Sequence, residues 1–465
     1  MVPFFSIMKD MYKEVLYLVK ISEGITDFFN SSVGVKQGCI LSPTLFSLYI
    51  NDLPSIFDST CEPPKLNDND ISYLLYADDL VLISESANGL QKCLDKLSLY
   101  CTSWDLTVNL DKTKVMIFNK SGKKLTKDKF VFSDNILEHC TEYKYLGILF
   151  KPSGSFTEAV RLLCKKASKA IFCIRKLLFS EDINVLPHLK LFDACVKPIL
   201  LYCSEVWSLY MIKDITNLES KYWSLATIKV QIKFAKTLIG VNKSAVNLAV
   251  LAELGMYPVF IEALKLSIGF WLHVIKSDNN CLLKDVYCSN LQLTNGFAKK
   301  IEQLLATLNF SHVWKNHDTI SKKRLLYAIH TKLNDRYLNY WKENIFCDNK
   351  SVHGNKLRTY RQLKENYKLE NYLLLNIDRK VIGHFAKIRI SNSVLRIEQG
   401  RHTKTPVEER ICPLCLLEVE DEFHFTLKCT KLNIIRDQLF SKISEIVPSF
   451  LNMTNEARFK FLYTC

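Results

Sequence analysis

The spacing of apolar and polar residues divides the chain into a mixed first third and a helical remainder. In residues 1–150, short apolar runs bounded by polar turns predict strands, as in "ISYLLYADDLVLISES", "FVFSD" and "YKYLGILF". Between them, "ANGLQKCLDKLSLYCTSW" has the apolar spacing of a helix. From about residue 156 onward helical spacing dominates, as in "FTEAVRLLCKKASKAIFCIRKLL" and "SKYWSLATIKVQIKFAKTLIG", with Gly240 as a C-cap of the second. We therefore predict an α+β fold, in which an antiparallel sheet with helices precedes a mostly α-helical region.

Composition narrows the class of protein. A length of 465 residues with 48% hydrophobic residues predicts two to four domains with real cores. The net charge of +14 is spread along the chain, which favours a polyanion-binding surface over a basic tail that binds membranes. We see no apolar stretch long enough to span a membrane and no signal peptide, and the 16 cysteines are too dilute for a disulfide scaffold. We expect an intracellular, reduced protein with no membrane partner, in either nucleus or cytoplasm.

Two adjacent aspartates interrupt the most apolar strand pair. Asp78 and Asp79 lie in "LLYADDLVL", where we predict a tight hairpin turn. Paired carboxylates on a rigid hairpin suit Mg²⁺, which binds a few carboxylates together with substrate phosphates, and two such ions can drive nucleotidyl transfer. The alternative is a polar turn, because Asp is common in turns.

A glycine-containing loop precedes this hairpin. In "GVKQGCILSPTLFSLYINDL", Gly34 and Gly38 allow the backbone to lie close to a ligand, and Gln37 offers an amide at the same place. Ser42 and Pro43 predict a helix start, with the serine as N-cap and the proline at the first helical position, and the helix running to about residue 53. This arrangement suits a template base or an incoming nucleotide.

Four motifs in order resemble one family. "GVKQGCILSP", "YADD", "NLDKTK" and "YKYLG" are similar to the palm of a reverse transcriptase from a non-LTR (LINE-type) retrotransposon. The resemblance implies that Asp78 and Asp79 are catalytic and bind Mg²⁺, and that Lys112 or Lys114 is the lysine near the active site. It also implies that "YKYLG", from Tyr143 to Gly147, is the primer-grip region.

The resemblance further implies the substrates: an RNA template, a DNA primer or target DNA, and dNTPs. The residues that it assigns to substrate binding are Gly34, Gln37, Gly38, Pro43, Tyr76, Tyr145 and Gly147.

The chain departs from the family pattern at its N-terminal side. Polymerases of the family take a further catalytic aspartate from a strand well upstream of the glycine loop, and only 33 residues precede Gly34. Asp10 lies in a predicted helix, and Asp27 lies in a predicted loop or exposed strand. We therefore expect the chain to be the C-terminal part of a longer element protein, without fingers or an endonuclease, and to be weak or inactive alone.

A basic stripe follows on "RLLCKKASKAIFCIRKLL". At about 100° per residue, Lys165, Lys169 and Lys176 fall within about 80° of Arg161, opposite the apolar face. This stripe lies where the family has its thumb, and it could contact phosphates without sequence specificity. The alternative is a solvated lysine face on a core helix.

The last segment has metal-ligand spacing. In "CPLCLLEVEDEFHFTLKC", Cys412, Cys415, His424 and Cys429 predict a closed tetrahedral Zn²⁺ site, whose ligand atoms should lie within about 4 Å of one another. The segment resembles the C-terminal zinc knuckle of the same retrotransposon proteins. Positive charge gathers on its approach, which predicts that it binds RNA or target DNA; these residues are Arg389, Arg396, Arg401, Lys404 and Arg410. A purely structural zinc is the alternative.

These features predict four regions. They are a truncated palm in residues 1–150, a thumb-like helical region in 151–245, a helical connection in 246–388 and a zinc-knuckle region in 389–465. The first hypothesis is part of a reverse transcriptase that uses Mg²⁺, and the second is a non-catalytic nucleic-acid-binding protein that uses the basic helix and the knuckle.

Overall fold

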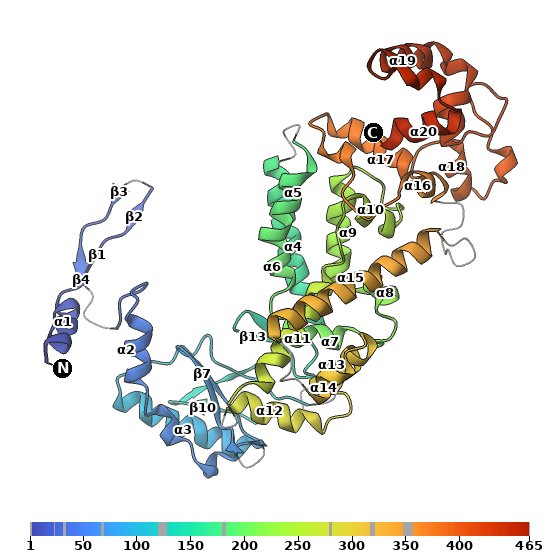
Figure 1. Cartoon of the computed structure of the whole chain (residues 1–465). Helices are drawn as coiled ribbons and strands as arrows, with labels where there is room; N and C mark the ends of the chain where they lie inside the picture. The colour runs from blue at the N-terminus through green and yellow to red at the C-terminus, as the bar shows by residue number, and fades with distance from the viewer. Residues whose placement is uncertain are drawn as a thin grey trace. The chain divides into compact units, whose positions relative to one another are not determined.

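The structure is a computed structural model of the chain (Figure 1), and it describes residues 2–22, 24–30, 34–66, 69–119, 128–178, 183–278, 281–316, 321–346 and 357–464. The chain divides into two compact units. The first unit comprises Met1–Ile117 and Lys124–Thr141, and the second comprises Phe118–Lys123 and Glu142–Cys465. Among the helices of the described ranges, none has both the length and the apolar character that crossing a membrane requires.

The first unit begins with helix α1 (Val2–Lys13) and a narrow ribbon of short strands, drawn in dark blue in Figure 1. The strands are β1 (Leu16–Tyr17), β2 (Lys20–Ile21), β3 (Gly24–Ile25) and β4 (Phe29–Asn30). Strand β1 pairs antiparallel with β4, and β2 pairs antiparallel with β3. Many apolar side chains of the ribbon are exposed, so it adds little to a core.

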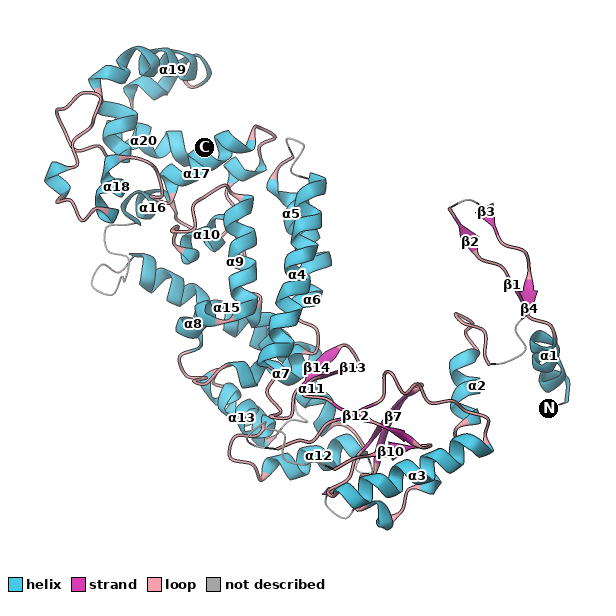
Figure 2. Ribbon diagram, turned by 180° about the vertical axis from the view of Figure 1, so that it is seen from behind, coloured by secondary structure: helices cyan, strands magenta, loops and turns pink. Residues whose placement is uncertain are grey.

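The core of the first unit forms where α2 (Ser42–Tyr49) and α3 (Ala87–Ser103) meet paired strands. The other elements are η1 (Leu53–Ile56), η2 (Ser59–Cys61), β5 (Lys65–Leu66), β6 (Asn69–Asp70), β7 (Tyr73–Tyr76), β8 (Asp79–Leu82), β9 (Lys114–Val115), β10 (Val131–Phe132), β11 (Asn135–Ile136) and β12 (Glu138–His139). Helix α3 lies along the strands in Figure 2 because its apolar face, with Leu94 and Leu97, is buried there. Phe46 of α2 and Leu80 of β8 pack on the same core, so the hairpin and the helix share one platform.

Two expectations about this unit need correction. The predicted hairpin is present as the antiparallel pair β7–β8, but the described strands of residues 30–150 form separate two-stranded pairs instead of one sheet. Strand β12 pairs with β9 in parallel. A parallel pair needs a connection of a dozen or more residues, and residues 116–137 separate β9 from β12 in the sequence. The coarse prediction of an α+β chain with small antiparallel pairs and many helices is confirmed.

The second unit begins with the hairpin β13 (Tyr143–Tyr145) and β14 (Ile148–Phe150) and is otherwise helical. Its first helices are α4 (Thr157–Leu178), α5 (Val185–Leu191), η3 (Phe192–Val196), α6 (Lys197–Leu200), α7 (Ser204–Met211), α8 (Leu218–Lys221), η4 (Tyr222–Ser224), α9 (Ala226–Leu238), α10 (Asn247–Glu253), α11 (Phe260–Ile275), α12 (Leu282–Leu291), α13 (Phe297–Thr307), α14 (Ser311–Lys315) and α15 (Lys322–Phe346). One large core joins them, built around buried aromatic side chains such as Trp207, Trp271 and Trp341.

Helix α9 shows how local sequence sets the boundaries. The helix predicted over residues 220–240 is interrupted by Leu225, whose backbone is extended, so α9 begins at Ala226. Its predicted C-cap is confirmed: Gly240 has φ +72°, and the N–H of Val241 donates to the carbonyl of Lys236 at 3.1 Å. Helices α4 and α9 lie side by side in both views.

The C-terminal part of the second unit, in orange and red in Figure 1, has a smaller core of its own. Its elements are α16 (Arg358–Leu363), η6 (Asn371–Leu374), α17 (Arg379–Arg389), α18 (Arg396–His402), η7 (Val407–Glu409), η8 (His424–Lys428), η9 (Thr430–Leu432), α19 (Asn433–Ile446), η10 (Pro448–Asn452) and α20 (Asn455–Thr464). Its buried side chains include Phe440, Phe450 and Phe459.

A buried ion cluster joins this part to the large core. Arg389 has no exposed surface, and its guanidinium lies 3.0 Å from Glu253 and 2.8 Å from Glu370. The hydroxyl of Tyr372 donates to Glu253 at 2.7 Å, and Arg389 also donates to the main-chain carbonyl of Tyr463. Burial alone would lower the pKa of Arg389, but the ion pair with Glu253 raises it above its ordinary value. The cluster therefore holds α10, α17 and α20 together through fully paired charges.

The cluster gives the first prediction. Arg389→Ala would leave the buried carboxylate of Glu253 without its cationic partner, while Glu370 keeps Lys364, and we expect it to lower the free energy of unfolding by about 3–5 kcal/mol. The measurement is chemical denaturation followed by circular dichroism. Arg396→Ala, at an exposed position of α18, is the matched control and should change stability by less than about 0.5 kcal/mol. Equal stability of the two variants would contradict a structural role for the cluster.

Candidate active site and metal-binding cluster

The aspartate pair lies at the tip of the β7–β8 hairpin. Ala77 and Asp78 form the two-residue turn, and Asp79 is the first residue of β8, paired with Tyr76. Ala77 has φ +53°, a left-handed conformation that favours glycine and costs about 1–2 kcal/mol for other residues. Tyr76, Asp78 and Asp79 are exposed. The turn therefore presents two carboxylates to solvent from a strained but anchored backbone.

No third metal ligand accompanies this pair among the described residues. Among the described residues, one group of three or more His, Cys, Asp or Glu side chains able to share an ion lies near the C-terminus, and none includes Asp78 and Asp79. Asp10 lies on α1 and Asp27 lies in the loop between β3 and β4, both exposed, as predicted. Within the described structure, neither aspartate completes the site.

The glycine loop adopts the backbone geometry that its sequence predicts. Gly34 has φ +83° and Gly38 has φ +79°. The N–H of Cys39 donates to the carbonyl of Lys36 at 3.2 Å, so Gly38 takes the third position of a β-turn, where positive φ is required in type II. Gln37 is exposed beside it, and nothing lies within 4 Å of a Cβ built on either glycine. The loop therefore leaves open space over its backbone.

The start of α2 differs from expectation. Ser42 is the first helical residue, and its side chain makes no N-cap hydrogen bond to the helix. Its hydroxyl instead donates to the carbonyl of Lys36 at 2.6 Å and lies 3.3 Å from the hydroxyl of Tyr12. Pro43 follows at the second helical position. Ser42 therefore fixes the glycine loop on the helix instead of capping the helix.

The two candidate lysines lie in different surroundings. Lys114 is on β9, where its ammonium lies 2.6 Å from Glu138 of β12. The hydrogen bond to Glu138 raises the pKa of Lys114 and lowers the pKa of the glutamate. Lys112 is exposed in the turn before β9. No hydrogen bond or ion pair within the described chain joins either lysine to Asp78 or Asp79.

The "YKYLG" motif is a second strained hairpin. Tyr145 ends β13, and Leu146 and Gly147 form the turn with φ +45° and +85°. The hydroxyl of Tyr202 donates to the carbonyl of Leu146 at 2.7 Å. A Cβ on Gly147 would lie only 3.0 Å from the Tyr202 ring, so the glycine is required for this approach. Tyr202, which no motif indicated, holds the turn in place.

The basic face of α4 lies beside this hairpin. The predicted division of the helix is confirmed: Arg161, Lys165, Lys169 and Lys176 are exposed, whereas Leu163, Ala167 and Ile174 are buried. A pocket of about 240 Å³ lies between the helix and the hairpin, and its lining includes Lys144, Gly147, Lys165, Lys166 and Lys169. The structure therefore brings the predicted primer-grip motif and part of the predicted basic stripe into one electropositive concavity.

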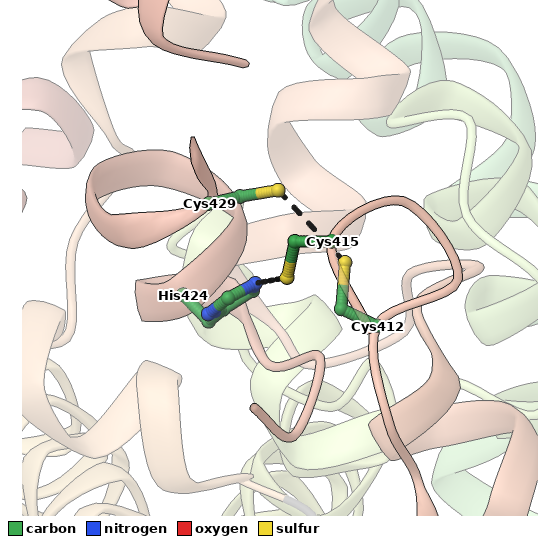
Figure 3. Close-up of side chains that lie close together, drawn as sticks. All are labelled: Cys412, Cys415, His424 and Cys429. Carbon is green, nitrogen blue, oxygen red and sulfur yellow. Dashed lines mark hydrogen bonds between the residues drawn. The ribbon is translucent and has the colours of Figure 1, made fainter. Parts of the chain in front are cut away.

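Four side chains near the C-terminus converge on one point (Figure 3). The Sγ atoms of Cys412 and Cys429 are 3.9 Å apart, and the Sγ of Cys415 is 3.3 Å from Nε2 of His424. All four ligand atoms lie within 4.8 Å of one another, a slightly wider spread than the 4 Å expected. The cysteine pair comes from a tight turn, where the N–H of Leu416 donates to the carbonyl of Cys412 at 2.9 Å. The cluster has the donors and spacing to bind a metal ion.

Surrounding groups orient these ligands. Nδ1 of His424 lies 3.4 Å from Oε2 of Glu418, which leaves Nε2 directed at the thiols. Backbone hydrogen bonding at Leu417 lowers the pKa of the Cys415 thiol to about 7, whereas burial raises the pKa of Cys412. Glu418 lies within the acidic run between Cys415 and His424, and this run could have predicted from the sequence that a carboxylate would support the histidine ligand.

A partly exposed arginine, Arg358, ties the metal cluster to the helices. Arg358 of α16 lies 2.5 Å from Glu422 and 3.0 Å from Glu398 of α18, and both carboxylates are buried. Thr359 also donates to Glu422 at 3.0 Å. Glu422 is two residues before the ligand His424. Sequence reasoning missed Arg358 because its partners lie 40 and 64 residues away.

The basic residues near the cluster divide into interior and surface groups. Arg389 is buried in its ion cluster and has no surface from which to contact a phosphate, so the structure does not support its predicted nucleic-acid contact. Arg410 donates to the carbonyls of Ile397 and Thr405 and is also structural. Exposed positive charge remains at Arg396 and Lys404, and Arg401 is partly exposed. The nucleic-acid contacts of these three stay a prediction.

Comparison with known proteins relates the chain to reverse transcriptases. Residues 2–150 match the family described as reverse transcriptase (RNA-dependent DNA polymerase). The probable RNA-directed DNA polymerase from transposon BS of Drosophila melanogaster is 25% identical over 214 residues, which are 44% of this chain and 23% of that protein. The RNA-directed DNA polymerase from mobile element jockey of Drosophila funebris is 25% identical over 183 residues, which are 38% of this chain and 19% of that protein.

A third relative is more similar over a shorter segment. The retrovirus-related Pol polyprotein from type-2 retrotransposable element R2DM of Drosophila melanogaster is 37% identical over 128 residues, which are 26% of this chain and 12% of that protein. In each comparison the matched segment spans about a quarter or less of the relative's length.

The hairpin clamp gives the second prediction. Tyr202→Phe keeps the ring against Gly147 but removes the hydrogen bond to Leu146, which should destabilise the hairpin by about 1 kcal/mol. Amide hydrogen exchange in residues 143–150 should then accelerate about fivefold, measured by mass spectrometry. Tyr327→Phe is the control, because Tyr327 is 74% exposed. Unchanged exchange in the Tyr202 variant would show that the turn holds without this bond.

Proposed function

We propose that this chain, which is related to the reverse transcriptases of non-LTR (LINE-type) retrotransposons, carries part of the polymerase site of an RNA-directed DNA polymerase. The observation that carries the proposal is the exposed pair Asp78 and Asp79 at a strained hairpin tip, within the segment that matches the family. Because the chain spans less than a quarter of the transposon BS and jockey polymerases that it matches, the activity is proposed for a longer protein.

In this proposal the hairpin supplies part of a two-metal site. The carboxylates of Asp78 and Asp79 would hold Mg²⁺ against the phosphates of a dNTP. The ions, when bound, activate the primer 3′-hydroxyl and stabilise the leaving pyrophosphate. The open backbone at Gly34 and Gly38, with the exposed Gln37, would accept the template base or the incoming nucleotide. Pro43 and Tyr76 would border this site, and Lys112 or Lys114, the latter paired with Glu138, would be the lysine near it.

Two carboxylates are insufficient for this chemistry alone. Two divalent cations a few ångströms apart repel each other strongly, and a bridging carboxylate is needed to hold them together. Because the described residues offer none beside Asp78 and Asp79, we propose that another segment of a longer polypeptide contributes it. A non-catalytic binding protein could also lack the bridging carboxylate, but the family match does not favour that alternative.

The helical region would bind the primer–template duplex. The four lysines that line the pocket between α4 and the β13–β14 hairpin present positive charge at the predicted primer grip. Tyr145 and Gly147 would position the primer strand, and Arg161 and Lys176 would extend the contacts along α4. On this proposal residues 1–150 act as the palm, 151–245 as a thumb-like region and 246–388 as a connection.

The C-terminal region, residues 389–465, would bind Zn²⁺ in a knuckle. Four zinc bonds of about 2.0–2.3 Å place tetrahedral ligands about 3.8 Å apart, which the observed sulfur–sulfur distance of 3.9 Å fits. The ion would fasten two segments that have little core of their own. The knuckle, with Arg396 and Lys404 exposed nearby, would contact RNA or target DNA.

Primer extension tests the polymerase proposal. The 465-residue chain alone should extend a primer on RNA weakly or not at all, and a longer protein that includes the preceding segment should be active. In that longer protein, Asp78→Asn should lower the extension rate by roughly a hundredfold or more, because it removes charge from the metal site. Asp105→Asn is the matched control: Asp105 is an exposed aspartate at φ +50°, which Asn tolerates. Equal activity with and without Asp78 would rule out the polymerase site.

Zinc content tests the knuckle. The purified chain should contain one zinc ion, and Cys412→Ser should lose it. Glu418→Gln should weaken zinc affinity by about 10–100-fold, because it removes the acceptor that orients His424. Affinity is measured by competition with a chromogenic chelator, and Glu409→Gln, an exposed glutamate in η7, is the control. Protein without zinc, or equal affinities for the two glutamine variants, would contradict this site.

A further inference from the structure

A polar pocket lies at the C-terminal end of α9. It has a volume of about 290 Å³, and its lining includes Asn242, Ser244, Asn392, Gln399 and Arg401. The volume is near the lower limit of small-ligand pockets, so it suits one nucleotide instead of a duplex. Amide, hydroxyl and guanidinium groups are those that recognise base edges and phosphates.

The pocket has a fixed wall and a guanidinium that can bind an anion. Asn392 accepts a hydrogen bond from the N–H of Asn242 at 2.9 Å and donates to the hydroxyl of Ser244 at 3.0 Å, so these residues are held in place. Nη1 of Arg401 is buried, lies 3.5 Å from Glu398 and makes no hydrogen bond within the described chain. Oε1 of Glu398 is paired with Arg358 and Oε2 faces the buried Nη1 of Arg401, so an incoming phosphate would be bound by the other donors of the Arg401 guanidinium, whose side chain is 31% exposed.

A row of lysines leads to the pocket along α9. Lys229, Lys233 and Lys236 fall within roughly 60° of one another at 3.6 residues per turn, opposite the buried face of the helix. Lys236 donates to the carbonyl of Lys243 at 2.7 Å, the residue between Asn242 and Ser244. The lysine face of α9 is therefore continuous with the pocket wall.

We propose that α9 and this pocket bind single-stranded nucleic acid, with phosphates along the lysines and one unpaired nucleotide in the pocket. Arg401 would bind the phosphate of that nucleotide, and Asn242 and Gln399 would contact its base. This proposal deepens the proposed function by adding a strand path separate from the duplex surface of α4. It does not depend on catalysis, because binding and primer extension are measured independently.

The experiment measures binding of the full chain to fluorescent single-stranded oligonucleotides across a range of salt concentrations, with RNA and DNA in parallel arms. The double variant Lys229→Gln and Lys233→Gln should reduce the slope of log affinity against log salt by about 1.4, since each lost phosphate contact on a single strand contributes about 0.7. The control is Lys322→Gln with Lys323→Gln, an exposed pair at the start of α15, which should leave the slope unchanged.

A second readout locates the nucleotide. Wild-type protein should crosslink 4-thio-substituted oligonucleotides to peptides that contain residues 242–244 or 392–402, and Arg401→Gln should remove these crosslinks. Gln399→Glu, at an exposed position, should do the same by repelling phosphate, and thermal unfolding checks that both variants fold. The stronger of the RNA and DNA arms identifies the strand. Crosslinks confined to other peptides, equal slopes for test and control pairs, or equal displacement by polyglutamate would overturn the proposal.

Discussion

Ion pairs between two arginines, Arg389 and Arg358, and carboxylates from distant segments hold the second unit together. Arg389 takes Glu253 from α10 and Glu370 from the segment before η6, while Arg358 takes Glu398 and Glu422. A buried charge without its partner costs several kcal/mol, so each arginine requires its acidic segments to arrive together. Both candidate sites of the C-terminal region depend on this, because Glu422 lies next to the metal cluster and Glu398 lies beside Arg401. The metal cluster and the pocket at Arg401 are therefore both positioned by the ion pairs of Arg358.

Strained turns mark both hairpins that carry family motifs. Ala77 and Leu146 have positive φ although neither is glycine, and each is the first residue of a two-residue turn. Such conformations persist only where surrounding contacts hold them, and they concentrate at functional sites. For Leu146 the holding contact is visible, since Tyr202 binds its carbonyl. For Ala77 the paired strands and their shared core with α3 supply the anchor. The strained residue Ala77 therefore directly precedes Asp78, and the strained residue Leu146 directly precedes Gly147, which lines the pocket beside α4.

Features set by neighbouring residues were predictable from the sequence, and features set by distant partners were not. The β7–β8 hairpin, the two faces of α4, the C-cap at Gly240 and the convergence of the Cys–His cluster all follow from short spacing rules. The parallel β9–β12 pair does not, because it joins strands that lie 22 residues apart in the sequence. Ser42 satisfied the rule for an N-cap, but α2 begins at Ser42 itself, and the serine hydroxyl donates to the carbonyl of Lys36, six residues away. Local rules state what a residue can do, and tertiary contacts decide among the options.

Arginine and lysine differ in hydration and in donor geometry, and this difference explains the largest error of sequence reasoning, which grouped Arg389 with surface charges. Arginine has a planar, weakly hydrated guanidinium with five donors, so it can be buried when several acceptors surround it, as they do at Arg389. Lysine is a strongly hydrated point charge, and the lysines of α4 and α9 remain exposed or partly exposed. Lys364 is the exception: burial lowers its pKa, and two carbonyls and Glu370 accept its hydrogen bonds. Of the net charge of +14, the part that can meet phosphates at the surface is therefore carried mainly by lysine.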